Sequence, residues 1–207
     1  MKPSAVFALV LCLFSSPLVA QSTSATLWLS QQLNEESSGI DDDDPSLIAE
    51  IGSGSGYGLS VSRLFTPRLS GELSIFRISA EGEVRSPAIL ADLGDIELTP
   101  IAAMLRFHFL PGQRFDVYAG AGIAYVSIDD LDSDDLRGGG LAPIRVSSET
   151  TAVLGAGATF DFSDRWGIAA DLRYIPLEIS GRPAGDTESV TADLDPLIVS
   201  AGIRVRF

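Results

Sequence analysis

The sequence of 207 residues is poor in residue types on which common protein sites depend. It has one cysteine, one histidine and a single lysine, Lys2. Cys12 lies in an apolar run near the amino terminus, so the remainder of the chain has no cysteine. Neither a disulfide framework nor a thiol nucleophile is therefore available there. One histidine without cysteine also excludes a zinc site built from the usual nitrogen and sulfur ligands, and we predict no metal site and no cofactor.

Long apolar runs and positive charge are scarce as well. No segment after the amino terminus has the roughly 18 consecutive apolar residues that a membrane-crossing helix needs. The formal charge is −14, whereas a surface that binds phosphate has to be basic, so we exclude nucleic acid as a partner. Much of the acid lies in two blocks, at residues 41–44 and 129–135, between segments with the pattern of strands. We therefore assign this acid to loops.

The first residues have the layout of a secretory signal peptide. Lys2 precedes an apolar run over residues 5–14, and Ala20 is a small residue at a plausible cleavage site. We predict a signal peptide at residues 1–20, which would carry Cys12 away with it. The length of the remainder, residues 21–207, suits a single domain.

The clearest secondary-structure signal lies at the carboxyl end. In residues 195–207 (Asp-Pro-Leu-Ile-Val-Ser-Ala-Gly-Ile-Arg-Val-Arg-Phe), the positions counted back in twos from Phe207 to Leu197 are apolar, and those between them are mostly polar or small. Side chains alternate faces along a strand, so one face suits lipid and the other a polar interior. Such a strand ending on an aromatic residue is typical of the last strand of a bacterial outer-membrane β-barrel.

Seven further segments alternate in the same way, the first of them weakly. They are residues 25–33, 56–65, 69–80, 98–109, 115–126, 150–162 and 166–177. The connections are short at 66–68, 110–114 and 163–165, and long at 34–55, 81–97, 127–149 and 178–194. Short turns at one end and long loops at the other predict an all-β fold, namely an eight-stranded antiparallel transmembrane β-barrel of the outer membrane.

A soluble lipocalin-like barrel would have the same strand count, but its apolar face would point to an internal cavity. Aromatic residues favour the membrane, because they gather at the strand ends beside the short turns, as in the girdle at a membrane interface. A buried aromatic layer is the alternative interpretation. The residues concerned are Phe65, Phe107, Phe109, Phe160, Phe162, Trp166 and Phe207.

Several of these strands resemble those of the outer membrane protein W (OmpW) family. The similar segments are 57–66 (Tyr-Gly-Leu-Ser-Val-Ser-Arg-Leu-Phe-Thr), 69–73 (Leu-Ser-Gly-Glu-Leu), 98–109 (Leu-Thr-Pro-Ile-Ala-Ala-Met-Leu-Arg-Phe-His-Phe), 117–125 (Val-Tyr-Ala-Gly-Ala-Gly-Ile-Ala-Tyr), 169–175 (Ala-Ala-Asp-Leu-Arg-Tyr-Ile) and 195–207. The sequence departs from the family at Thr99-Pro100, where a double proline is usual, and at Leu197, where an aromatic residue is common. The resemblance implies both termini in the periplasm, no enzymatic activity, and a role in letting small apolar molecules cross the outer membrane.

The phase of each strand sorts its inward residues by depth. An ionic group is expected near the short turns, comprising Glu72, Arg106, His108, Asp161, Asp171, Arg173, Arg204 and Arg206. An apolar pocket is expected near the long loops, lined by Phe76, Ile78, Met104, Val153, Ile175 and Ile198. Since unpaired buried charge is costly, the ionic group should form a paired plug. The pocket is either a route for apolar solutes or simply core packing.

His108 and the acidic loops are the remaining candidates for chemistry. His108 lies beside a short turn. Barrel enzymes that act on lipid hold their histidine at the opposite end, the outer rim. We therefore expect His108 to be hydrogen-bonded to a lumen acid, and we assign no catalytic residue. The alternating aspartates of 130–135 suit a hard cation, but Asp135 and Leu141 stand where an EF-hand has glycine and glutamate. We interpret this segment as a solvated loop, with loose divalent bridging to lipopolysaccharide as the alternative.

Two functions remain open on the sequence. The first is a passive channel for small hydrophobic molecules. The second is a sealed structural or surface-interaction barrel that displays acidic extracellular loops and transports nothing. In either case the expected partners are outer-membrane lipid, lipopolysaccharide and, through Phe207, the barrel-assembly machinery.

Overall fold

The computed structural model describes residues 23–33, 36–39, 48–86, 89–128, 144–146, 148–183 and 190–207. The predicted signal peptide at 1–20 and the acidic blocks at 41–44 and 129–135 lie outside the described residues. Within the described part of the chain, no helix is long and apolar enough to cross a membrane.

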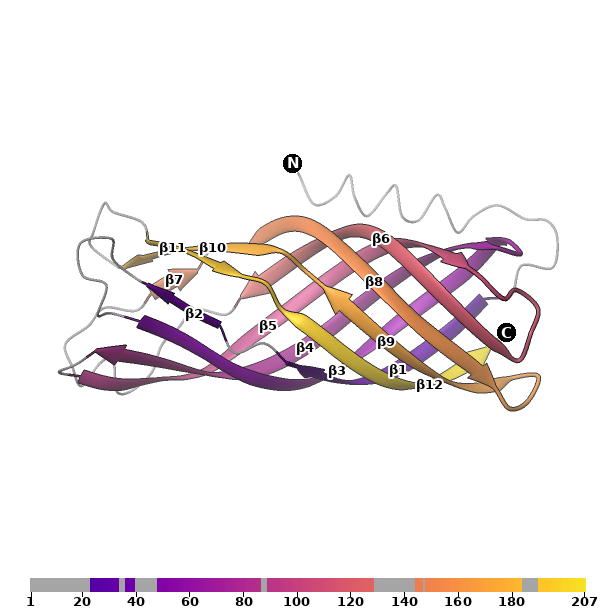
Figure 1. The fold of residues 1–207 in the computed structure, drawn as a ribbon, viewed down its shortest axis with the longest axis horizontal. Coiled ribbons are helices and arrows are strands. Elements are labelled where there is room, and N and C mark those ends of the chain that lie inside the picture. The colour runs from indigo at the N-terminus through magenta and orange to yellow at the C-terminus, as the bar shows by residue number, and fades with distance from the viewer. Residues whose placement is uncertain are drawn as a thin grey trace.

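Eight antiparallel strands form a closed barrel (Figure 1), as the alternation predicted. They are β1 (Thr23–Gln32), β3 (Ile48–Thr66), β4 (Leu69–Ser86), β5 (Ile89–His108), β6 (Phe115–Ile128), β8 (Glu149–Asp161), β9 (Trp166–Tyr174) and β12 (Leu197–Arg206). Each strand pairs with its neighbours in chain order, and β1 pairs with both β3 and β12. The first and last strands therefore close the barrel and leave no edge.

The short turns lie where the sequence placed them, and local hydrogen bonds hold them. Thr66 Oγ1 accepts hydrogen bonds from the backbone N–H groups of Arg68 and Leu69 at 3.3 and 3.0 Å. Ser163 Oγ accepts one from the N–H of Trp166 at 2.9 Å. Gly112 supplies the positive φ of 79° that the turn between β5 and β6 requires.

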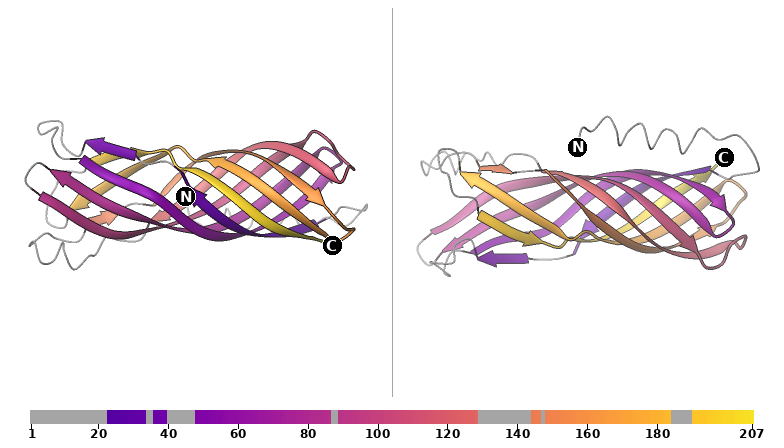
Figure 2. Two further views of the ribbon diagram at one scale, coloured as in Figure 1. Left: turned by 60° about the horizontal axis from the view of Figure 1, so that its bottom comes forward. Right: turned by 90° about the horizontal axis from the view of Figure 1, so that it is seen from above.

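The opposite end extends beyond the barrel, and here the predicted connections were partly wrong. Strands β4 and β5 stay paired as far as Ser86 and Ile89, so most of 81–97 is a hairpin. Strand also occupies parts of the predicted connections 34–55, 127–149 and 178–194. The additional strands are β2 (Glu36–Gly39), β7 (Ile144–Val146), β10 (Leu177–Pro183) and β11 (Val190–Leu194). They lie at the end away from the carboxyl terminus (Figure 2).

The residues that point out of the barrel and those that point into it are the ones that the alternation along each strand predicted. In β9, Trp166, Ile168 and Leu172 are exposed on the outside, while the alternate residues Asp171 and Arg173 are buried inside. Ala156, Ile203 and the other residues of their phase also point outward. The outer surface is thus an apolar band. Aromatic residues at both of its rims mark the membrane interfaces, with phenylalanines and Trp166 beside the short turns and Tyr57 and Tyr125 toward the other end.

Candidate functional site in the barrel lumen

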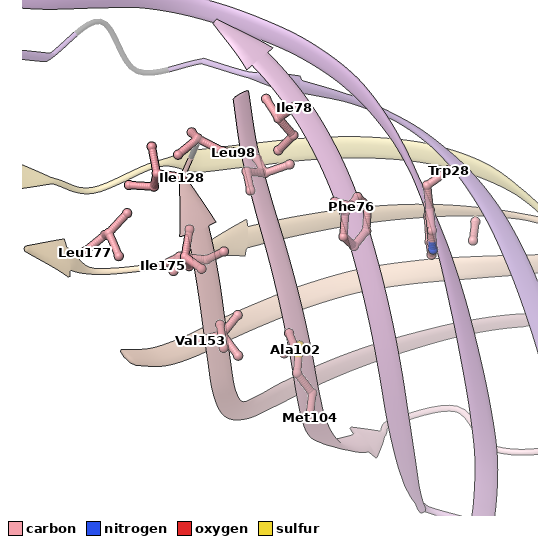
Figure 3. Close-up of a cluster of buried hydrophobic side chains, with 14 residues drawn as sticks. Trp28, Phe76, Ile78, Leu98, Ala102, Met104, Ile128, Val153, Ile175 and Leu177 are labelled. Atoms are coloured by element: carbon pink, nitrogen blue, oxygen red, sulfur yellow. The ribbon is translucent and has the colours of Figure 1, made fainter. Parts of the chain in front are cut away.

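The upper lumen, on the side away from the short turns, is lined by apolar side chains from strands all around the wall (Figure 3). All six residues predicted for the pocket are buried there, each with at most 4% of its surface exposed. They are Phe76 and Ile78 on β4, Met104 on β5, Val153 on β8, Ile175 just after β9, and Ile198 on β12.

The apolar cluster contains further residues besides these six. They are Trp28, Leu98, Ala102, Ala124, Val126, Ile128, Ala169 and Leu177. Trp28 is an inward aromatic residue on β1, and its indole N–H donates to Ser60 Oγ on β3 at 2.9 Å. The alternation of β1 directs Trp28 inward, but in the sequence this alternation is too weak to show which face meets lipid.

The upper lumen is closely packed. Among the described residues, the cavity in this region has a volume of about 10 Å³ and is lined by Gln32, Ile78, Leu98, Pro100, Val126, Ile175, Leu177, Pro196 and Ile198. A single water molecule needs about 10–15 Å³, so this space is no open channel. Any solute has to displace side chains before it can enter.

Below the apolar cluster, Glu72, Arg106, Asp171 and Arg173 form a buried ionic cluster. Arg173 donates from Nη2 to Glu72 Oε1 at 2.8 Å and from Nε to Asp171 Oδ1 at 2.5 Å. Arg106 contacts Glu72 directly and reaches Asp171 Oδ2 at 3.3 Å. Two positive and two negative side chains therefore neutralise one another across β4, β5 and β9.

Neutral polar groups complete this cluster. The Tyr118 hydroxyl donates to Asp171 Oδ2 at 2.6 Å, and Arg173 Nη1 donates to Ser74 Oγ at 2.6 Å. The guanidinium of Arg173 also lies 4.5 Å from the centroid of the Phe76 ring, at the junction with the apolar cluster. Phe76 thus covers the ionic cluster from above through a cation–π contact.

The space for these large side chains comes from glycines on neighbouring strands. A Cβ at Gly58 would lie 2.3 Å from the Phe76 ring, and one at Gly157 would lie 2.5 Å from the Tyr118 hydroxyl. Glycine at these two positions therefore leaves room inside the barrel for the Phe76 and Tyr118 rings.

The remaining predicted ionic residues lie closer to the short turns. His108 is hydrogen-bonded to Ser70 Oγ through Nε2 at 2.8 Å and to Asp116 through Nδ1. Asp116 also accepts from the backbone N–H of Leu110 at 3.0 Å, which ties the turn to the start of β6. His108 therefore has an acidic partner, but one that the sequence analysis did not name.

The last group joins β8 to β12. Asp161 is paired with Arg206 and lies 3.8 Å from Arg204. With Asp116 counted, the described lumen contains four carboxylates and four arginines. Among the described residues, no group of three or more histidine, cysteine or acidic side chains has the arrangement of a metal site.

Two outer-membrane barrels of known structure have a similar fold. OprG of Pseudomonas aeruginosa is 17% identical, with a TM-score of 0.80 over 91% of this chain and 96% of that one. The solid-state NMR structure of AlkL in DMPC bilayers is 18% identical, with a TM-score of 0.63 over 93% of this chain and 95% of that one. At such identities the likeness establishes the fold.

The sequence comparisons establish the family. Outer membrane protein AlkL of Ectopseudomonas oleovorans is 25% identical over 128 residues, which are 61% of this chain. The match spans about half, 53%, of the length of that relative. The model of the OmpW family matches residues 29–207, which confirms the resemblance found in the strands. The chain is therefore a β-barrel protein of the bacterial outer membrane and belongs to the OmpW family.

Proposed function

We propose that this barrel is a passive channel through which small hydrophobic molecules cross the outer membrane. The observation that carries the proposal is the chemistry of the upper lumen. Eight of the nine residues around its cavity, among them Ile78, Val126 and Ile175, are apolar, whereas a water-filled pore would be lined by polar side chains. Moving apolar solute surface from water to such a lining is favourable by about 25 cal/mol per Å².

The ionic cluster below prevents a straight path to the periplasm. Arg106 and Arg173 are each bonded to both Glu72 and Asp171, and separating buried ion pairs is costly. An apolar solute would also have to displace these charges without replacing their hydrogen bonds. We infer that a solute entering from outside leaves sideways, through the wall and into the membrane.

The pairing between β4 and β5 suggests where the wall opens. The two strands are paired at Ile75 and Ile101 and again at Ile78 and Leu98, but no pairing joins the residues between these points. Pro100 lies in the gap, and proline has no N–H to donate to a neighbouring strand. Ile78, Leu98 and Pro100 also line the cavity, so the gap adjoins the apolar lumen.

A reversible lock across this gap tests the proposal. Arg77→Cys with Thr99→Cys places two thiols on the outer face at the gap, in a chain whose only natural cysteine is in the predicted signal peptide. Oxidation should abolish entry of the apolar dye N-phenylnaphthylamine into cells expressing the protein, and a reductant should restore it. The matched control is Leu73→Cys with Ala103→Cys, a directly paired position with the same phase. Equal dye entry with the disulfide at the gap closed and open would refute the lateral path.

The close packing of the lumen favours the second candidate, a sealed barrel that displays loops. A cavity of about 10 Å³ is what a structural anchor would have. The two candidates differ in whether the apolar side chains move: Met104 is unbranched and flexible, which suits a lumen that opens transiently.

On either function we expect contact with lipopolysaccharide, and recognition of the exposed Phe207 by the barrel-assembly machinery.

We also propose that the protein is not an enzyme. Ser70, His108 and Asp116 are hydrogen-bonded in the order of a hydrolase triad. Ser70 is only 2% exposed, however, and it lies at the end of the lumen that the ionic cluster separates from the apolar pocket. A nucleophile has to touch its substrate, so this arrangement fits a structural connection between β4, β5 and β6 better than catalysis.

A further inference from the structure

Gln32 is the one polar residue among the described residues that line the upper cavity. It ends β1, is 1% exposed, and is paired in the wall with Gly54 and Ile198, neither of which has a polar side chain. Neither its amide oxygen nor its amide nitrogen makes a hydrogen bond to any residue that the structure describes. A buried amide without partners is costly, so its presence in an apolar lining needs an explanation.

Other inward polar side chains of β1 do have hydrogen-bond partners on the neighbouring strands. Ser24 is hydrogen-bonded to Ser62, and Ser30 to Ser200, both at 2.8 Å. The indole of Trp28 is bonded to Ser60. Each of these pairs crosses to a neighbouring strand, whereas Gln32 faces Gly54 and Ile198. Its amide is thus directed at the space in which a solute would lie.

We propose that Gln32 binds the hydroxyl head group of an otherwise apolar, uncharged solute such as a straight-chain alcohol. This inference rests on the proposed channel and names its solute class. A carboxamide presents an acceptor and a donor side by side, and a hydroxyl group supplies the complementary donor and acceptor. The alkyl chain would occupy the space between Ile78, Leu98 and Val126.

The charges of the lumen argue for an uncharged head group. An ionised head group buried beside Gln32 would need an opposite charge. Arg173 is paired in the wall with Ile198, the neighbour of Gln32, but its charge is already neutralised by Glu72 and Asp171. The region of Gln32 therefore selects against carboxylates and ammonium groups while accepting a hydroxyl.

Trp28 provides a reporter inside the same lumen. It precedes Gln32 by four residues on the same face of β1, about 13 Å along the strand. The sequence has two tryptophans, so Trp166→Phe leaves Trp28 as the only one. In this background, quenching of Trp28 by a medium-length alkanol with a terminal bromine is compared with quenching by the bromoalkane of equal length, in reconstituted vesicles.

Gln32→Leu removes the amide, and Gln31→Leu is the matched control. Gln31 is the next residue on β1 and points outward, so this control makes the same chemical change on the lipid side. Each hydrogen bond lost should weaken bromoalkanol binding in Gln32→Leu about two- to tenfold relative to Gln31→Leu. Bromoalkane binding should be equal in the two. Gln32→Met, which keeps the side-chain length, repeats the comparison without altering the packing much.

The outcomes separate this inference from the channel itself. If both probes quench Trp28 and the bromoalkanol binds equally in Gln32→Leu and Gln31→Leu, the head-group site is refuted and the channel stands. A Trp28→Phe protein retains only the outward Trp166, whose quenching reports that the probes have entered the bilayer. If the probes quench Trp166 there but never Trp28, the lumen admits no solute, and the channel and the head-group site are refuted together.

Discussion

The ionic cluster of the lumen should be the part of the barrel most sensitive to loss of one charge. Asp171 accepts hydrogen bonds from Arg173 Nε, Arg106 Nη2 and the Tyr118 hydroxyl. Asp171→Asn keeps the shape of the side chain but removes its charge. Glu72 would then be the only carboxylate for two buried arginines, and the cluster would carry a net positive charge.

The expected cost follows from the burial of the cluster. The side chains of Asp171 and Arg173 are 1% and 2% exposed, so solvent cannot screen the stranded charge. Removing one partner of a buried pair costs about 3–5 kcal/mol, and we expect Asp171→Asn to lower the free energy of unfolding by this amount. Asp164→Asn, in an exposed turn, is the control and should change it by less than about 0.5 kcal/mol.

The assay is a urea titration of the barrel in lipid vesicles, followed by tryptophan fluorescence. Adding Arg173→Met to Asp171→Asn leaves Arg106 paired with Glu72 and restores neutrality, so the double variant should cost less than the sum of the single ones. We expect a coupling energy of about 1–3 kcal/mol. Strict additivity, or a cost for Asp171→Asn no larger than that of Asp164→Asn, would show that the cluster does not hold the strands together.

Two further predictions concern the wall. Leu172→Arg places a charge on the lipid face. If the residue lies near the midplane, the change should lower the free energy of unfolding by about 2–4 kcal/mol, measured again by urea titration. Spin labels at 172 and 173 check which residue faces lipid, because greater access of lipid-dissolved oxygen to 173 would contradict the assigned phase. Gly157→Ala should cost about 1–3 kcal/mol, since its Cβ would lie 2.4 Å from the Ala170 carbonyl oxygen and 2.5 Å from the Tyr118 hydroxyl. Tyr118→Phe should relieve part of that cost. An unchanged cost would place the conflict with the Ala170 carbonyl and with the ring carbon that phenylalanine keeps, which would lie 2.6 Å from the added Cβ.

The strands and their faces could be predicted because the membrane imposes a strict pattern on the sequence. Where one face of a strand meets lipid, apolar residues have to recur at every second position, as from Leu197 to Phe207. The pattern fixes which residues point inward, and so Arg173 and Ile198 could be placed in the lumen from their neighbours alone.

The strands beyond the membrane could not be predicted in this way. Outside the lipid band no face has to be apolar, so backbone pairing continues through polar and small residues without an alternating signal. The hairpin formed by the ends of β4 and β5 is an example, in which strand persists to Ser86 and from Ile89. The sequence there has the composition of a loop, although the backbone is paired throughout except for one register shift between Gly82 and Glu83.

Some lumen residues were missed although the sequence contained a signal for them. Asp116 and Tyr118 follow the outward Phe115 and Val117, so alternation alone assigns both to the lumen. Gln32 and Trp28 lie on β1, whose alternation is weak because the inward face includes the apolar Trp28 and the outward face includes the polar Gln31. Which acid pairs with which base, by contrast, depends on the register between distant strands, and that register is a property of the fold.

The central claim is that apolar solutes use the upper lumen. The most direct measurement is entry of N-phenylnaphthylamine into cells expressing Met104→Asp with Ile198→Asp, compared with Met104→Leu with Ile198→Leu as the size-matched apolar control. Folding of both is checked by the different gel migration of heated and unheated protein. We expect the aspartates to depress dye entry strongly while uptake of a small polar sugar hardly changes. Undiminished dye entry through a folded aspartate variant would contradict the channel and favour the sealed barrel.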